Sequence, residues 1–303
     1  MKFSGRIKDV NSDFEFLEQS ISDDEAQQYY VDWMAKYRKY FRDGSEIKTI
    51  IMANRSIRAR REIITSAILF EESKVARDNG CISATYFLTY YSLFHAMWSV
   101  LFLNSDLNNS ISEITHQKLK NLFCDYYTRN NFFDVDMKDY ITKHKDMREF
   151  FSYNVPFNMI GDAIDFDLIE QIVLKCFQLT NLHNSMLAKC SGFLNVTEEN
   201  IPWIKTYFAV FNGRTRENGK MLEDPSEEHQ LIEMLKYGIK IENYEIELSN
   251  DWDEMGYAYY LDGKFDEVAV DRVKSNALNL VYIHNIYLFV SCLYYTFASS
   301  ETK

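Results

Sequence analysis

His144 and Arg148 form a pair whose side chains and spacing suit chemistry on a phosphate group. On a helix, residues four positions apart lie on one face, with Cβ atoms about 6 Å apart. An imidazole can transfer protons, and a guanidinium can stabilise negative charge on a phosphate. Tyr153 and Asn154 follow closely in the chain and can add hydrogen bonds. The spacing predicts a site in which His144 is the base and Arg148 the phosphate clamp. The alternative is an ordinary exposed helix face, because charged residues surround both positions.

A second candidate for phosphate binding is an arginine cluster that includes Arg55, Arg58 and Arg61 at the start of a predicted helix. The stretch from Lys36 to Arg61 holds nine basic residues against two acidic ones, whereas residues 223–271 carry the excess acidic charge behind the net value of −12. A basic segment in an acidic protein can bind phosphate or nucleic acid. The alternatives are that the two segments face each other, within the fold or across a dimer, or are simply solvated.

Other kinds of catalytic site lack a sequence signal. The chain has no glycine-rich phosphate loop, no Ser–His–Asp order and no carboxylate cluster with metal-ligand spacing. Its five cysteines are dispersed, without a Cys-x-x-Cys pair, and each is expected to be a small core residue in a reducing compartment. We therefore expect no metal ion and no cofactor. The N-terminus lacks the apolar core of a signal peptide, so the cytoplasm is the expected location.

The composition predicts a mainly α-helical protein. Aromatic residues make up 16% of the chain, too many for a disordered protein, and 3 prolines with 10 glycines are too few for many short strands and turns. Residues 84–103 carry no charge and predict an apolar helix about 30 Å long. Because tyrosines at its centre do not suit the middle of a membrane span, we expect other helices, not lipid, to surround it. His95 within it is expected to be a neutral core residue bonded to a hydroxyl.

Hydrophobic periodicity and capping residues divide the chain into helices and three larger regions. Helices are predicted over residues 22–43, from 45 or 55 to 78, and over 84–103, 116–127, 139–151 and 165–189. The predicted regions are an N-terminal helical extension (1–54), an antiparallel four-helix bundle (55–190) and an acidic, mostly helical C-terminal segment (191–303). A small β-hairpin is one alternative for part of the last segment.

Three segments of the chain are similar to parts of a known family. The run Tyr86-Phe-Leu-Thr-Tyr-Tyr-Ser-Leu-Phe-His-Ala-Met-Trp resembles the second-helix signature of HEPN domains (higher eukaryotes and prokaryotes nucleotide-binding), written Tyr-Tyr-Ala-x-Phe-His-Ala followed by apolar residues. Thr115-His116 is similar to the start of the family's histidine-containing helix. Arg148-Glu-Phe-Phe-Ser-Tyr153 is similar to its Arg-x-x-Ala-Asp-Tyr segment, with Phe-Ser in place of Ala-Asp. The segments occur in the family's order within residues 55–190.

The resemblance implies a helical bundle that works in a prokaryotic defence or toxin–antitoxin type module, as a homodimer or with a cognate protein partner. Many HEPN domains are metal-independent ribonucleases in which two Arg-x(4–6)-His motifs from paired chains form one site. Here the fifth to seventh positions after Arg148 hold Tyr153, Asn154 and Val155, so the family's histidine is absent from that motif. This departure favours binding over cleavage.

The first hypothesis is therefore a divergent, non-membrane HEPN protein that binds RNA or a nucleotide. In it, Arg148, Tyr153, Asn154 and the arginines near residues 55–61 contact phosphates. The second hypothesis is a metal-independent endoribonuclease with a rearranged site of His144 and Arg148. The third is a dimerising adaptor without catalysis.

Overall fold

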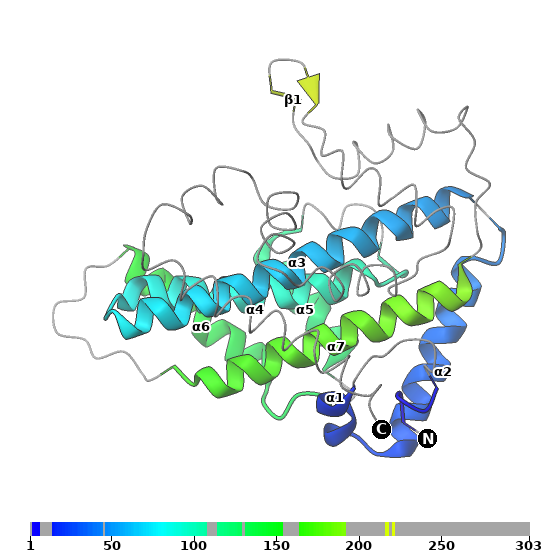
Figure 1. Ribbon diagram of the computed structural model, residues 1–303, viewed down its shortest axis with the longest axis horizontal. Coiled ribbons are helices and arrows are strands. Elements are labelled where there is room, and N and C mark those ends of the chain that lie inside the picture. The colour runs from blue at the N-terminus through cyan, green and yellow to red at the C-terminus, as the bar shows by residue number, and fades with distance from the viewer. Residues whose placement is uncertain are drawn as a thin grey trace, which may run out of the picture.

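The computed structural model describes residues 2–6, 14–44, 46–107, 114–128, 131–153, 164–191, 216–217 and 220–221 (Figure 1). Within these ranges the chain is mainly α-helical, as the composition predicts. The helices are α1 (Glu15–Ser20), α2 (Asp23–Tyr40), α3 (Glu46–Asp78), α4 (Ile82–Phe102), α5 (His116–Tyr127), α6 (Met137–Tyr153) and α7 (Phe166–Cys190). Strands β1 (Arg216–Glu217) and β2 (Lys220–Met221) pair antiparallel, with Arg216 opposite Met221. The predictions made for the rest of residues 192–303 lie outside the described residues.

Helix α2 begins at the predicted capping box. The backbone N–H of Glu25 donates to Ser22 Oγ at 3.3 Å, and the backbone N–H of Ser22 donates to a Glu25 carboxylate oxygen at 2.8 Å. These two bonds satisfy backbone donors that a helix N-terminus otherwise leaves open. The hydrogen bond from the Ser22 backbone also lowers the pKa of Glu25.

A tight turn reverses the chain between α3 and α4. Gly80 has a φ of +71°, a left-handed conformation that favours glycine. The backbone N–H of Cys81 donates to the carbonyl of Ala76 at 2.8 Å, which closes the end of α3 in a Schellman-type cap. The two long helices therefore run antiparallel. Helix α3 itself is continuous through residues 54 and 55, where the predicted extension meets the predicted bundle.

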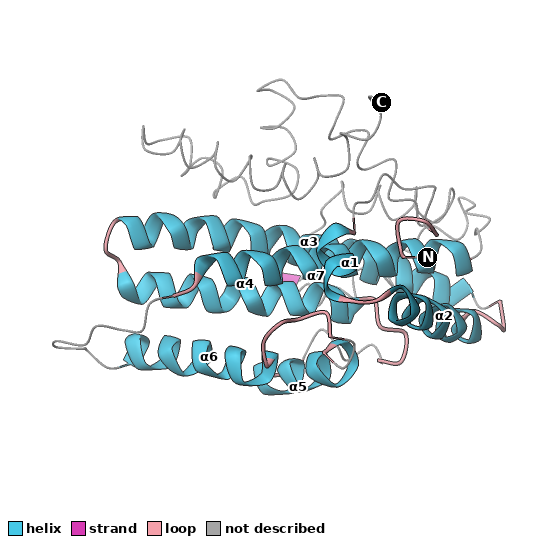
Figure 2. Ribbon diagram, turned by 90° about the horizontal axis from the view of Figure 1, so that it is seen from below, coloured by secondary structure: helices cyan, strands magenta, loops and turns pink. Residues whose placement is uncertain are grey.

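Helix α4 is the uncharged helix of the sequence, and it contacts α3, α5, α6 and α7. Leu93 and Val100 are fully buried. Its small polar residues allow close approach: Ser66 Oγ donates to the carbonyl of Ser92 at 2.7 Å, and Ser92 Oγ donates to the carbonyl of Ser66 at 2.9 Å. Figure 2 shows α5 and α6 along one side of the α3–α4 pair. Most of α4 is buried against these helices, which explains why its sequence needs no charge.

Helices α1 and α2 pack against α7 around a buried histidine, His183. Its Nδ1 lies 2.7 Å from Tyr37 Oη, and its Nε2 lies 2.8 Å from Tyr29 Oη. Tyr37 Oη donates its single proton to the carbonyl of Leu103 at 2.9 Å, so Nδ1 must be the donor to Tyr37 and Nε2 the acceptor from Tyr29. Burial lowers the pKa of His183 to about 3, so the ring is neutral at pH 7. The segment before residue 54 thus shares one core with α7.

No helix among the described residues combines the length and apolar character needed to cross a membrane.

Candidate functional site

Arg148 of α6 lies on two tyrosines of α4. Its guanidinium carbon is 4.9 Å from the ring centroid of Tyr90 and 5.7 Å from that of Tyr91. Nη1 donates to Tyr91 Oη at 3.2 Å, and Nη2 donates to the Glu149 carboxylate at 2.9 Å. The arginine side chain is 13% exposed, and that of Glu149 is 40% exposed. A phosphate that binds Arg148 therefore competes with Glu149 for Nη2.

His116, the first residue of α5, completes this group. Thr115 caps the helix by accepting a hydrogen bond from the backbone N–H of Lys118, which fixes where the helix starts. The His116 ring stacks on Phe94 with centroids 4.2 Å apart, and its Nδ1 lies 2.8 Å from Tyr90 Oη. Burial lowers the pKa of His116, and the nearby positive charge of Arg148 lowers it further. The site therefore presents a neutral imidazole beside a guanidinium. We call Tyr90, Tyr91, His116 and Arg148 the Arg148 site.

Exposed aromatic surface borders the Arg148 site. Phe87 is one turn before Tyr91 on α4, its ring centroid is 4.6 Å from that of Tyr91, and it is 44% exposed. Exposed aromatic rings near positive charge are surfaces on which single-stranded nucleic acids stack their bases, and Phe87 adjoins Tyr91, the ring that Arg148 contacts. Tyr153, at the end of α6, is 82% exposed. Asn154 lies outside the described residues.

His95 differs from the expectation of a core histidine bonded to a hydroxyl. Its Nδ1 contacts a carboxylate oxygen of Glu62 on α3 at 2.5 Å, and Arg58 Nε pairs with the other oxygen at 2.5 Å. The ring is 21% exposed and packs against Tyr91 with centroids 6.4 Å apart. The expectation was wrong because residue 95 is on the face of α4 that meets α3, where Glu62 needs partners for a side chain only 4% exposed.

The predicted arginine cluster does not form one surface. Arg55 is 1% exposed and donates to the carbonyls of Asn104 and Leu107, at 3.1 and 2.7 Å. It points inward because carbonyls at and beyond the C-terminus of α4 lack helical partners and need donors. Its guanidinium is therefore not available to a phosphate at the surface. Arg58 pairs with Glu62 and lies 5.8 Å from the Trp98 ring centroid. Arg61 is half-buried.

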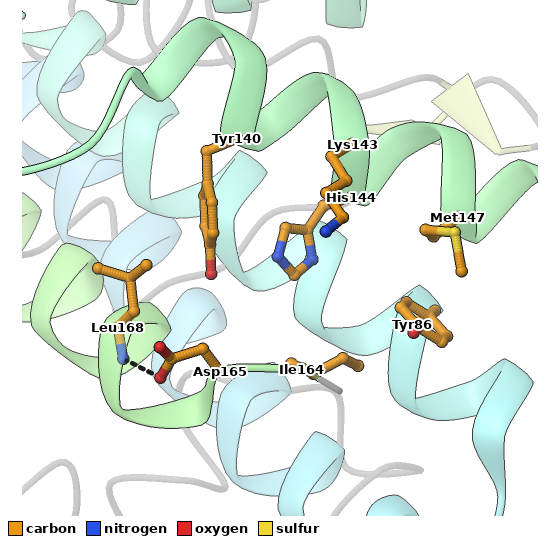
Figure 3. Close-up of a pocket in the computed structure, with 8 residues that line it drawn as sticks. All are labelled: Tyr86, Tyr140, Lys143, His144, Met147, Ile164, Asp165 and Leu168. Atoms are coloured by element: carbon orange, nitrogen blue, oxygen red, sulfur yellow. Dashed lines mark hydrogen bonds between the residues drawn. The ribbon is translucent and has the colours of Figure 1, made fainter. Parts of the chain in front are cut away.

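His144 and Arg148 both lie on α6, but their side chains contact different residues. His144 is 7% exposed, so the alternative of an exposed helix face does not hold for it. Its ring lies 4.6 Å from that of Tyr140 and lines a cavity whose lining does not include Arg148 (Figure 3). Burial lowers the pKa of His144 to about 4. His116, not His144, is the histidine that shares the two tyrosines with Arg148.

Sequence reasoning missed the role of His116 as the partner of Arg148 and did not single out Phe87 or His183. Within the described part of the chain, no group of three His, Cys, Asp or Glu residues is placed to hold a metal ion. Comparison with protein-family models, curated proteins and solved structures finds no match for this chain.

Proposed function

We propose that this protein is a divergent HEPN-type protein that binds RNA or a nucleotide through the Arg148 site. The observation that carries the proposal is that Arg148 lies on Tyr90 and Tyr91 beside the neutral ring of His116. The guanidinium would bind a phosphate, and the exposed ring of Phe87 would stack on a base. Lys145, three residues before Arg148 on α6, pairs with Glu149 at 3.4 Å and places a second positive charge near His116.

The family assignment is supported by where the three HEPN-like segments meet. Tyr90 and Tyr91 come from the tyrosine-rich segment, His116 from the histidine-containing segment, and Arg148 from the third segment. Residues from these separate parts of the chain make one site. On this proposal α3, α4, α6 and α7 form the four-helix HEPN-like bundle, and the chain works with a second copy or a cognate partner in a prokaryotic defence or toxin–antitoxin type module.

The test is a binding titration with a fluorescent single-stranded RNA, comparing the parent with Arg148→Gln. A charged hydrogen bond to phosphate predicts an affinity loss of about ten- to hundredfold at low salt. The salt dependence of log K should become shallower by about 0.7, the slope per phosphate contact for single strands. Arg77→Gln is the matched control, because Arg77 also lies over an aromatic ring, 4.2 Å from the Phe166 centroid, but at the end of α3.

Absence of RNA and nucleotide binding by the parent would exclude the proposal and leave the adaptor hypothesis. Equal losses in the Arg148 and Arg77 variants would point to nonspecific charge attraction and would also contradict it.

A second candidate is a metal-independent endoribonuclease, favoured by the neutral imidazole of His116 next to Arg148. In the tautomer with Nδ1–H donating to Tyr90 Oη, Nε2 is the basic nitrogen, and it would take the proton of a ribose 2′-hydroxyl as that oxygen attacks the adjacent phosphorus. The bond between phosphorus and the 5′-oxygen would break, the leaving 5′-oxygen would take a proton from water, and Arg148 would stabilise the charge on the phosphate. Cleavage of labelled RNA in the presence of a chelator, lost in His116→Gln and kept in His144→Gln, would support this assignment over the His144–Arg148 pair. Loss of cleavage in the His144 variant alone would instead support the His144–Arg148 pair.

A further inference from the structure

The cavity beside His144 is partly open to solvent and is lined by side chains of α4, α6 and the start of α7. Its volume is about 240 Å³, and apolar groups of Tyr86, Met147, Ile164 and Leu168 make up much of its wall (Figure 3). An apolar cavity of about 150 Å³ is enough to hold benzene. The space therefore suits a molecule with one aromatic ring and a substituent.

Two buried polar atoms at this cavity lack hydrogen-bond partners among the described residues. They are His144 Nδ1 and Tyr140 Oη. Figure 3 shows both side chains reaching from α6 toward Ile164 and Asp165. Buried polar groups in native proteins nearly always have a partner, from the protein, from water or from a ligand. The pair therefore marks the position at which a polar group of a bound molecule would be recognised.

The polar end of the cavity is uncharged near pH 7. Burial and, to a smaller extent, the charge of Lys143 lower the pKa of His144 to about 4. Burial also raises the pKa of Tyr140, so its hydroxyl stays protonated. A neutral imidazole nitrogen and a phenol match a group that can both donate and accept a hydrogen bond. A buried carboxylate at this end would lose its hydration, and the exposed Lys143 would offset only part of that cost, so a carboxylate would be disfavoured.

The two charged lining residues mark the exposed side of the cavity. Lys143 and Asp165 are both exposed, and they carry opposite charges. Asp165 caps α7 by accepting a hydrogen bond from the backbone N–H of Leu168 at 3.0 Å. The entrance thus has no excess of one sign that would select an anion or a cation.

We propose that this cavity is a binding site for a small neutral aromatic molecule that carries a hydroxyl or amide group. The ring would lie against Tyr86 and Met147, and the polar group would bond to Tyr140 Oη and His144 Nδ1. The inference is independent of RNA binding, because Arg148 does not line the cavity.

The test uses phenol and benzamide as probes, with toluene and benzoate as controls for the polar group and for charge. Binding is measured by ligand-observed NMR and calorimetry on the full chain. Phenol and benzamide should bind, and toluene and benzoate should bind at least about tenfold more weakly, because toluene leaves the two polar atoms unpaired and benzoate brings an uncompensated charge. Equal binding of toluene would contradict the proposed recognition, as would failure of both polar probes to bind at millimolar concentration.

Two variants locate the site. Tyr140→Phe should weaken phenol binding by about two- to tenfold, the value of one neutral hydrogen bond. It removes a hydroxyl without a partner, so it should not unfold the protein. Met147→Trp should abolish binding by filling the cavity. Tyr126→Phe, on α5 and outside the cavity lining, is the matched control and should leave affinity unchanged.

A measurement on the parent chain needs no variant. In protein with nitrogen-15-labelled histidine, adding phenol should shift the ring nitrogen resonances of His144 and leave those of the fully buried His183 in place. Binding without a shift at His144, or an unchanged affinity in Tyr140→Phe, would place the probe elsewhere and overturn the proposal.

Discussion

Arg148 and Tyr91 interact in two ways: Nη1 of the arginine donates to Tyr91 Oη at 3.2 Å, and the guanidinium carbon lies 5.7 Å from the centroid of the same ring. The tyrosine therefore orients Arg148 through its hydroxyl and supports it through its ring. These two contacts hold the guanidinium in place without a ligand, which would lower the entropy cost of binding a phosphate.

Replacing Tyr91 should separate these two contributions. Tyr91→Phe keeps the ring and removes the acceptor, so RNA affinity should fall by about two- to fivefold. Tyr91→Leu also removes the aromatic face and should cost more than about tenfold, because the cation–π contact and the stacking surface next to Phe87 are lost. Fluorescence polarisation with single-stranded RNA checks both values. Equal affinities for the two variants would show that the ring contributes nothing.

Removing the Glu149 carboxylate, which pairs with Arg148, should strengthen the binding of RNA. Glu149→Gln frees Nη2 from its ion pair, so RNA affinity should rise by about two- to tenfold at low salt and less at high salt. Asp146→Asn on the same helix changes the net charge equally and serves as the control. If both variants raised affinity to the same extent, the effect would be general electrostatics and not release of Arg148.

His183 should be a major contributor to stability. His183→Phe leaves Tyr29 and Tyr37 without their buried imidazole partner, and the expected loss is about 2–4 kcal/mol in the free energy of unfolding. Urea unfolding followed by circular dichroism measures it. Adding Tyr29→Phe to the variant should recover part of the loss, because it removes a buried hydroxyl whose proton has lost its acceptor, whereas Tyr37 keeps its bond to the carbonyl of Leu103. No recovery would mean that cavity or packing effects, not hydrogen bonds, dominate.

Stability should fall in mild acid partly because of His144. Its pKa is about 4 in the folded protein against 6.5 ordinarily, so the unfolded chain binds the proton more tightly. The contribution of His144 is therefore complete above pH 6.5 and is lost as the pH falls toward 4, with a slope of up to about 1.4 kcal/mol per pH unit. Unfolding free energies at pH 7 and pH 5 should differ less in His144→Gln than in the parent. An identical pH dependence would contradict the neutral, buried state of His144.

Local signals in the sequence were sufficient to predict most of the helices. The capping box at Ser22, the charge-free run of α4 and the glycine after α3 each depend on neighbouring residues, and the structure confirms them. The site depends on contacts between distant segments, which spacing does not encode. His144 is close to Arg148 in the sequence and His116 is distant, yet the packing of α5 against α4 places His116, not His144, on the tyrosines that Arg148 contacts.

Arg55 also shows that contacts between distant segments cannot be predicted from local sequence. The sequence predicts a surface cation, but in the structure Arg55 is buried and donates to carbonyls that follow the end of α4. Arg55→Leu leaves the carbonyls of Asn104 and Leu107 without their buried donors, and the free energy of unfolding should fall by about 2–4 kcal/mol. RNA affinity, measured at a temperature where the variant is fully folded, should not change. Arg58→Gln, three residues on and 28% exposed, should cost less than Arg55→Leu, because the glutamine amide can still donate to Glu62 and His95 still contacts that carboxylate. A loss of RNA affinity in folded Arg55→Leu, with no loss of stability, would restore the hypothesis that Arg55 binds phosphate.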